Sequence, residues 1–238
     1  MKRSLRSQLR VLALAGLVLP VPAIAASTDP AATEAVRVGV MLTVLAIIPA
    51  LLISTTSFIR IVVVLAMIRH AFGMPQTPPN AVLTSLALFL TAFVMGPTLT
   101  DLNQDAVQPF IEGRTEISEA MENGAQPLKR FMLRHTRDAD LEMVYRISDS
   151  PLPATAKEVD LLKLTPAFML NELRVAFTIG FVILLPFLLI DLVVASILLS
   201  LGMMMVPPTT ISLPIKVLMF VLIDGWSLVV EGLLGSFA

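Results

Sequence analysis

The 238-residue sequence contains no cysteine and little charge. Without cysteine the chain can have no disulfides, no thiol chemistry and no metal site with cysteine ligands. Charged residues make up 15% of the chain, against roughly 25% in soluble domains. By contrast, 56% of the residues are hydrophobic and the mean hydropathy is +0.85. We therefore expect an all-α integral membrane or membrane-complex protein, built from long kinked helical hairpins with a small helical periplasmic domain.

The sequence also lacks the signatures of catalysis. It has no phosphate-binding glycine loop, no G-x-S-x-G elbow and no H-E-x-x-H motif. The two histidines, His70 and His135, lie in different regions, which favours polar surface or interface groups over metal ligands. We therefore expect a protein that is not an enzyme and that binds no cofactor and no metal.

The N-terminus has the three regions of a secretory signal. Basic residues precede an apolar stretch over residues 11–19, which is followed by small residues up to Ala25. We predict a cleavable signal peptide over residues 1–25 and a short periplasmic lead over 26–37. Residues 1–25 hold four of the 17 basic residues and none of the 18 acidic ones, so the mature chain has a net charge of −5. This charge argues against nucleic acid as a partner.

Residues 38–100 are predicted to form an N-terminal hydrophobic helical hairpin. Residues 38–68 are almost entirely apolar and, as one helix, would be about 46 Å long, more than the roughly 30 Å of a bilayer core. This stretch must tilt, kink at Pro49 or extend beyond the membrane. Arg60 within it is predicted to be a buried charge that faces a partner or an aqueous space. A proline-rich turn then leads to an ordinary-length span at residues 81–99.

Residues 101–165 are richer in charge and predict a small helical domain. An even number of preceding passes would place it in the periplasm. Its best helix is expected to start at Pro127, with Leu128, Phe131, Met132 and His135 on one face. So few residues bury little surface, and Phe131 and its neighbours can pack against another subunit or form a local core.

Residues 166–238 are predicted to form a C-terminal helical hairpin that turns near Met203. Only six charged residues follow position 165: Glu172, Arg174, Asp191, Lys216, Asp224 and Glu231. Asp191 and Lys216 lie at nearly equal distances from Met203, and so do Arg174 and Glu231. We predict both as buried ion pairs across an antiparallel hairpin, and Asp224 as a further buried charge. The alternative, left open here, is that these charges pair between subunits.

Three consecutive methionines, Met203, Met204 and Met205, occupy the predicted turn. Thioether side chains are flexible and polarisable, so a ring of them could seal an opening and adapt to a moving object. Methionine also fills irregular cores, but consecutive residues cannot all face one core.

Several motifs spread along the chain resemble the FliP family of flagellar type III export-gate proteins. They are TSFIRIV at 56–62, QTPPN at 76–80, LALFL at 86–90, ELRVAF at 172–177, IGF at 179–181, PFLLIDLVVAS at 186–196, GMMM at 202–205, ISLP at 211–214 and DGW at 224–226. The injectisome counterparts, the SctR family, are similar, and the predicted signal peptide favours the flagellar branch.

This resemblance implies a core subunit of the export gate in the bacterial inner membrane and flagellar basal body. About five copies would assemble with FliQ and FliR into a closed helical pore for unfolded flagellar proteins, alongside FlhA and FlhB of the export apparatus. It also implies a pore gasket made by Met203, Met204 and Met205, and subunit contacts at Phe131 and Glu172.

Two other functions are compatible with the residues alone. A proton-coupled secondary transporter could use Asp191, Asp224 and Glu231 as its coupling carboxylates. A scaffold that only templates other subunits would need none of these groups.

Overall fold

The computed structural model describes residues 30–74 and 76–237, which are largely helical and include no strand. The predicted all-α fold class is confirmed. The chain divides after Ala50 into two compact units, of which the first contains the beginning of α2 (Pro30–Thr55). The predicted signal peptide, residues 1–25, lies outside the described residues.

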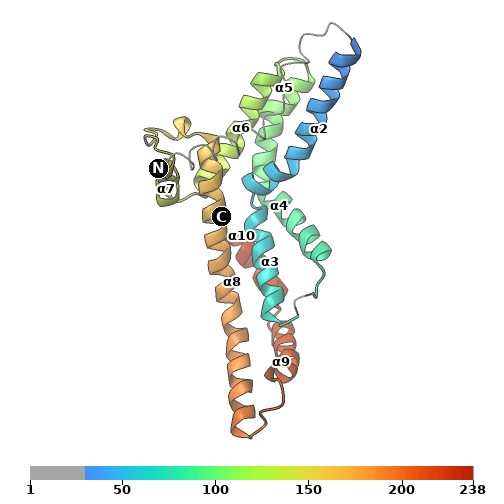
Figure 1. Ribbon diagram of the computed structural model, residues 1–238, viewed down its shortest axis with the longest axis vertical. Helices are drawn as coiled ribbons and strands as arrows, with labels where there is room; N and C mark the ends of the chain where they lie inside the picture. The colour runs from blue at the N-terminus through green and yellow to red at the C-terminus, as the bar shows by residue number, and fades with distance from the viewer. Residues whose placement is uncertain (1–29, 75, 238) are drawn as a thin grey trace, which may run out of the picture. The chain divides into compact units, whose positions relative to one another are not determined.

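The second unit contains the remaining elements (Figure 1). They are α3 (Phe58–Ala71), α4 (Asn80–Leu102), a π-helical turn η1 (Asn103–Val107), α5 (Gln108–Ile111), α6 (Ile117–Arg134), α7 (Asp138–Ile147), a 3₁₀ turn η2 (Ala156–Glu158), α8 (Leu161–Ser200), α9 (Pro208–Leu222) and α10 (Gly225–Gly235).

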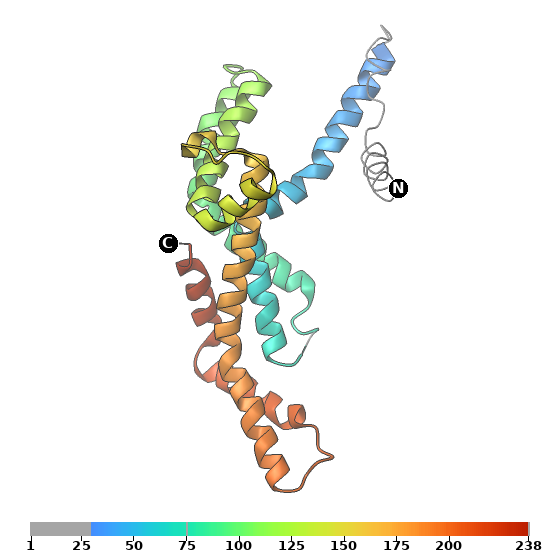
Figure 2. The same ribbon diagram turned by 60° about the vertical axis from the view of Figure 1, so that its left-hand side comes forward.

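The 40-residue helix α8 is the central element of this unit. Its N-terminal part packs against α6 and α7, and its middle packs against α3. After the turn that follows Ser200, α9 returns along the C-terminal part of α8, as Figures 1 and 2 show. Helix α4 contacts both α3 and α6, which themselves pack against α8. Within this unit, α3, α6, α7 and α9 therefore pack directly against α8.

Several helices are long and apolar enough to cross a membrane. By length and composition, Asn80–Ile111 and Leu161–Ser200 qualify as single helices among the described residues. Two bent pairs also qualify when each is counted as one span: Leu45–Thr55 with Phe58–Ala71, and Pro208–Leu222 with Gly225–Gly235. The apolar helices expected from composition are therefore present.

Pro49 and Pro127 both lie inside helices. Helix α2 continues through Pro49, and its backbone ladder is interrupted instead at Thr56 and Ser57. Helix α6 begins at Ile117, so the prediction that it starts at Pro127 was wrong. An interior proline loses one backbone hydrogen bond, but Pro127 is fully buried, and its packing offsets part of this loss.

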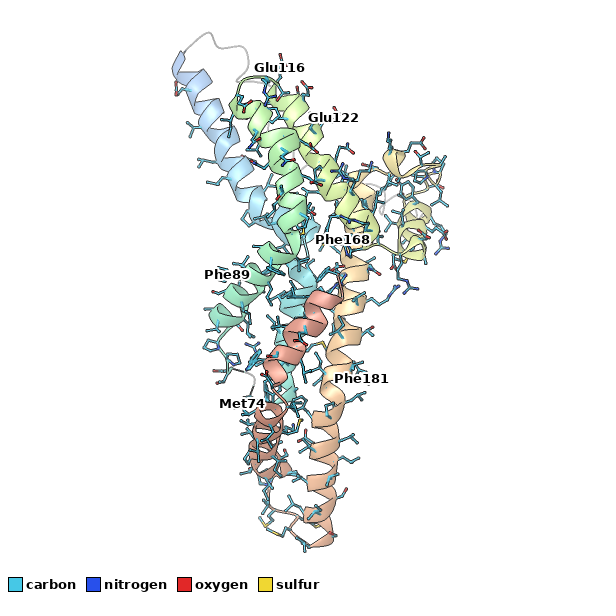
Figure 3. All side chains as sticks on the ribbon, turned by 180° about the vertical axis from the view of Figure 1, so that it is seen from behind. Met74, Phe89, Glu116, Glu122, Phe168 and Phe181 are labelled. Carbon is cyan, nitrogen blue, oxygen red and sulfur yellow. The ribbon has the colours of Figure 1, made fainter. Side chains whose placement is uncertain are left out.

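The core consists of two clusters of buried side chains. One lies where α6 meets α8 and is centred on Phe131 and Phe168, whose rings are 5.9 Å apart in an edge-on arrangement. Phe168 is labelled in Figure 3. The other lies between α3 and α8 and includes Ile61, Phe187 and Phe220. These clusters hold the helices that carry the buried charges described below.

Helices α3 and α8 approach closely at Gly180. A Cβ atom there would lie 2.2 Å from Met67 Sδ and 3.1 Å from Met67 Cβ. The thioether end can move aside, but Met67 Cβ is fixed by the α3 backbone. Glycine at position 180 therefore sets the separation of the two helices.

We predict that Gly180→Ala destabilises the protein by about 2 kcal/mol, because it overpacks the α3–α8 contact. The measurement is the midpoint of thermal unfolding of the purified protein in mild detergent. Gly232→Ala is the matched control, because Gly232 is also inside a helix and a Cβ atom added there would have no neighbour within 4 Å. An equal effect of both substitutions would contradict the close-contact explanation.

Candidate functional site

The turn between α8 and α9 presents the three methionines on a well-defined backbone. Gly202 adopts a left-handed conformation, with φ of +74°. The Met203 amide donates to Leu198 O at 2.9 Å, and the Gly202 amide donates to Leu199 O at 3.0 Å. This pair of bonds is the Schellman arrangement that ends a helix at glycine. Pro207 and Pro208 then start α9, where a proline at the first helical position costs no hydrogen bond.

The methionine side chains of this turn are exposed in the single chain. The exposed fraction is 43% for Met203, 82% for Met204 and 97% for Met205. None of the three is part of either core cluster. We call residues 202–207 the Met loop. Its backbone is fixed at both ends, while its thioether side chains are available to a neighbouring surface.

Lys216 and Asp191 connect α9 to α8 just inside the Met loop. Lys216 Nζ lies 2.6 Å from Asp191 Oδ2 and also donates to the backbone oxygen of Ala71 at 3.1 Å. Ser212 Oγ donates to Asp191 Oδ1 at 2.7 Å. The structure thus brings together the residues of the first predicted ion pair. They join α9, α8 and the end of α3.

The second predicted pair, Arg174 with Glu231, does not form within the chain. Arg174 instead makes two hydrogen bonds, of 2.8 and 3.1 Å, to the buried carboxylate of Asp140 on α7. Glu231 is exposed on α10. The symmetry about Met203 ends at Ile223, because α10 is bent by 66° from α9. Asp224, predicted as a further buried charge, is exposed in this bend in the single chain.

Arg60 is buried, and its partner is Glu172. Arg60 Nε donates to Glu172 Oε2 at 2.9 Å, and Arg60 Nη2 bonds to the other carboxylate oxygen. Arg60 Nη1 also donates to the backbone oxygen of Ser236 at 2.7 Å. The guanidinium lies 3.8 Å from the centre of the Phe237 ring. Arg60 therefore joins α3, α8 and the end of α10.

The residues predicted to contact other subunits lie inside the chain. Glu172 has no exposed surface, and Phe131 is buried against Phe168. Neither side chain presents a surface to a second subunit in this structure, so the interface prediction does not hold for these two residues. Their burial supports the local core that was the other interpretation of Phe131.

Four residues in these contacts were missed from the sequence: Asp140, Ser212, Ser236 and Phe237. Asp140 precedes Leu141 in an amphipathic helix, where an acidic residue in the first turn favours the helix N-terminus. This signal does not identify Arg174 as its partner. Ser212, Ser236 and Phe237 carried no signal beyond their position near charged or terminal segments.

These charged groups are arranged as structural ion pairs. Among residues 30–74 and 76–237, no three His, Asp or Glu side chains come close enough to hold a metal ion. The carboxylates of Asp191, Glu172 and Asp140 each accept hydrogen bonds from a basic side chain.

Comparison with known proteins identifies the family. The FliP family profile matches residues 41–233. The chain belongs to the FliP family. It is 49% identical to the flagellar biosynthetic protein FliP of Caulobacter vibrioides, over 94% of this chain and 88% of that protein. It is 45% identical to FliP of Bacillus subtilis, over 89% of this chain and 96% of that protein. It is 49% identical to FliP of Pectobacterium carotovorum, over 86% of this chain and 80% of that protein.

The range shared with the FliP family covers the Met loop, Arg60, Glu172 and the Lys216–Asp191 pair. It ends before Ser236 and Phe237, which contact Arg60. The contact of Arg60 with the C-terminus therefore lies at the edge of the FliP match.

For this chain we predict that Asp191→Asn destabilises the protein by about 3 kcal/mol, because it leaves a buried ammonium without a countercharge. This is the low end for buried pairs, since the Asp191 side chain is 35% exposed while that of Lys216 is 5% exposed. The double variant Asp191→Asn with Lys216→Met should be less destabilised than the single one. Thermal unfolding in detergent measures both.

The control for this prediction is Arg130→Gln, which removes an exposed pair with Asp101. An exposed pair contributes at most about 1 kcal/mol. If Asp191→Asn were no more harmful than Arg130→Gln, Lys216 would not depend on Asp191.

Proposed function

We propose that this chain is a non-enzymatic core subunit of the flagellar type III protein export gate, and that its Met loop seals the closed pore. The observation that carries the proposal is an exposed triple methionine held on a fixed turn in a chain of the FliP family. The relatives named above are flagellar biosynthetic proteins, which favours the flagellar gate over its injectisome counterpart.

The proposed assembly contains about five copies of this chain together with FliQ and FliR. FlhA and FlhB of the export apparatus act with it, and unfolded flagellar proteins pass through its pore. It lies in the bacterial inner membrane at the flagellar basal body, with residues 101–165 in the periplasm. The apolar helices described above support the membrane placement.

Exposed apolar side chains support an assembly of several chains. Phe89 on α4 and Phe181 on α8 point away from the packed helices in Figure 3, with exposed fractions of 77% and 55%. Soluble monomers rarely expose large contiguous apolar surfaces. These faces need lipid or other apolar protein surfaces, and a ring of subunits supplies the latter.

The Met loop suits a passive seal. Its backbone is held by the Schellman bonds and the two prolines, so the loop position is defined. The unbranched side chains can change rotamer and fill the axis when no substrate is present. They can then separate around a polypeptide of varying cross-section, while the energy for transport comes from partner proteins.

We predict that replacing Met203, Met204 and Met205 together by alanine makes the membrane leaky to ions and small solutes, because alanine cannot fill the axis. The measurement is membrane permeability in cells that produce the variant. Leucine at the same three positions retains volume and should leak less than alanine.

Met121→Ala is the control for this experiment, because Met121 is 72% exposed on α6, outside the Met loop. It should leave permeability unchanged. Unchanged permeability of the triple alanine variant, with normal amounts of the assembly, would contradict the seal and favour a scaffold.

The proton-coupled transporter gains no support from the positions of its three carboxylates. Asp191 is engaged by Lys216 and Ser212, whereas Asp224 and Glu231 are exposed on the bend and on α10. They do not form a continuous relay within the chain.

We predict that the complex extracted in mild detergent has a native mass several times the 25.7 kDa of one chain and contains two other small hydrophobic proteins. Native mass spectrometry with identification of the component chains measures this. A lone chain would contradict the gate and return the transporter to consideration.

A further inference from the structure

The last described residues of the chain are fastened to Arg60. Arg60 Nη1 donates to the backbone oxygen of Ser236 at 2.7 Å and to Ser236 Oγ at 2.9 Å. Ser236 Oγ in turn donates to the backbone oxygen of Leu233 at 2.7 Å. The Phe237 ring lies under the guanidinium, 3.8 Å from its central carbon. Three kinds of contact thus hold the end of α10 at one buried side chain.

The guanidinium fits this position because its donors point in fixed directions. One edge of Arg60, made of Nε and Nη2, faces both oxygens of Glu172. The remaining nitrogen, Nη1, is directed at Ser236. The flat face is left for the aromatic ring. A lysine ammonium can pair with Glu172. It cannot at the same time make two parallel hydrogen bonds to Glu172, donate to Ser236 and stack on an aromatic ring.

Phe237 also connects the end of α10 to α4 and α6. It packs against both core clusters and lies 5.6 Å, centre to centre, from the ring of His135 at the end of α6. With Phe131 and Phe93 it also lines a cavity of about 410 Å³ between α4, α6 and α10. Removal of Phe237 would enlarge this cavity and uncover Arg60.

The opposite end of α10 has the features of a defined bend. Asp224 is in the left-handed conformation, with φ of +49°, and its side chain makes no capping bond to the first turn of α10. Such a conformation is costly for a residue other than glycine. At Gly225, a Cβ atom would lie 2.2 Å from the Phe220 ring. The chain turns here by 66°.

We propose that α10 is a strap that closes over the buried Arg60–Glu172 pair, with a hinge at residues 223–225 and a latch formed by Arg60, Ser236 and Phe237. Arg60 is a positioning residue for the strap in addition to being the partner of Glu172. Helix α9 is held separately by Lys216 and Asp191. Release of the latch therefore loosens α10, which still packs through Val229 and Leu233, and leaves α9 and the Met loop in place.

The test is amide hydrogen exchange, followed by mass spectrometry, on the full-length protein in its detergent-extracted complex. Arg60→Lys keeps the charge opposite Glu172 and removes the latch. We expect exchange over residues 226–235 to accelerate about tenfold or more, since hydrogen bonds from a charged donor are lost. Exchange over residues 209–222 should change little.

Phe237→Ala tests the latch from its other side and should accelerate exchange in the same segment. Arg174→Lys is the matched control, because Arg174 also makes a forked pair, but with Asp140 on α7 rather than with residues at the end of α10. It should leave exchange in α10 unchanged.

Two outcomes would overturn the proposal. In the first, α10 exchanges at the wild-type rate in both Arg60→Lys and Phe237→Ala. In the second, Arg60→Lys accelerates exchange throughout α3 and α8 as much as in α10, which would make Arg60 a general packing residue. Both readouts are independent of permeability and export, so failure of the strap is distinguishable from failure of the proposed gate.

Discussion

The removal of Arg60 and Glu172 from water constrains how α3 and α8 can pack. Each ion would cost several kcal/mol if buried alone, and only a well-formed hydrogen-bonded pair offsets that cost. The two hydrogen bonds from Arg60 to the Glu172 carboxylate fix the axial position of α3 against α8. About two turns further along both helices, roughly 11 Å away, Met67 meets Gly180. Two contacts with nearly equal spacing on parallel helices permit only one register.

The second buried cation extends this arrangement to the hairpin. Lys216 reaches the last residue of α3, Ala71, as well as Asp191 on α8. These contacts therefore define the position of α9 relative to both helices. They also define the position of the Met loop, which lies between α8 and α9. Replacing a buried pair with apolar residues is often neutral for stability, so the value of these charges lies in the single geometry that they select.

The sequence predicted the features that depend on local pattern. Glycine, methionines and two prolines at residues 202–208 predicted the turn, and equal spacing about it predicted the partnership of Asp191 and Lys216. The same reasoning failed for Arg174, because its partner Asp140 belongs to a different helix, and no spacing rule relates the two. The sequence pattern also predicted the wrong start for α6. Burial of Pro127 outweighs the local preference of proline for the first turn of a helix.

Charge alone could not separate a structural role from an interface. From the sequence, Glu172 was an expensive ion without an identified partner, and its subunit contact was implied only by the family resemblance. Arg60 lies 112 residues earlier in the chain, and only the folded arrangement of α3 along α8 joins the two. The exposed apolar surface lies instead on the outer faces of α4 and α8 and at the Met loop.

The Met loop combines a fixed backbone with mobile side chains, and this combination determines what closing a pore would cost. Burying an exposed methionine is favourable by about 1.5–3 kcal/mol. Because the Schellman bonds and the prolines already order the main chain, little further backbone entropy would be lost if copies of the loop met as proposed. Only the rotamers of the methionine side chains would have to be ordered, and this ordering is readily lost again. A seal of this kind can be tight without substrate and still yield to a polypeptide, because opening it does not require the helices to unfold.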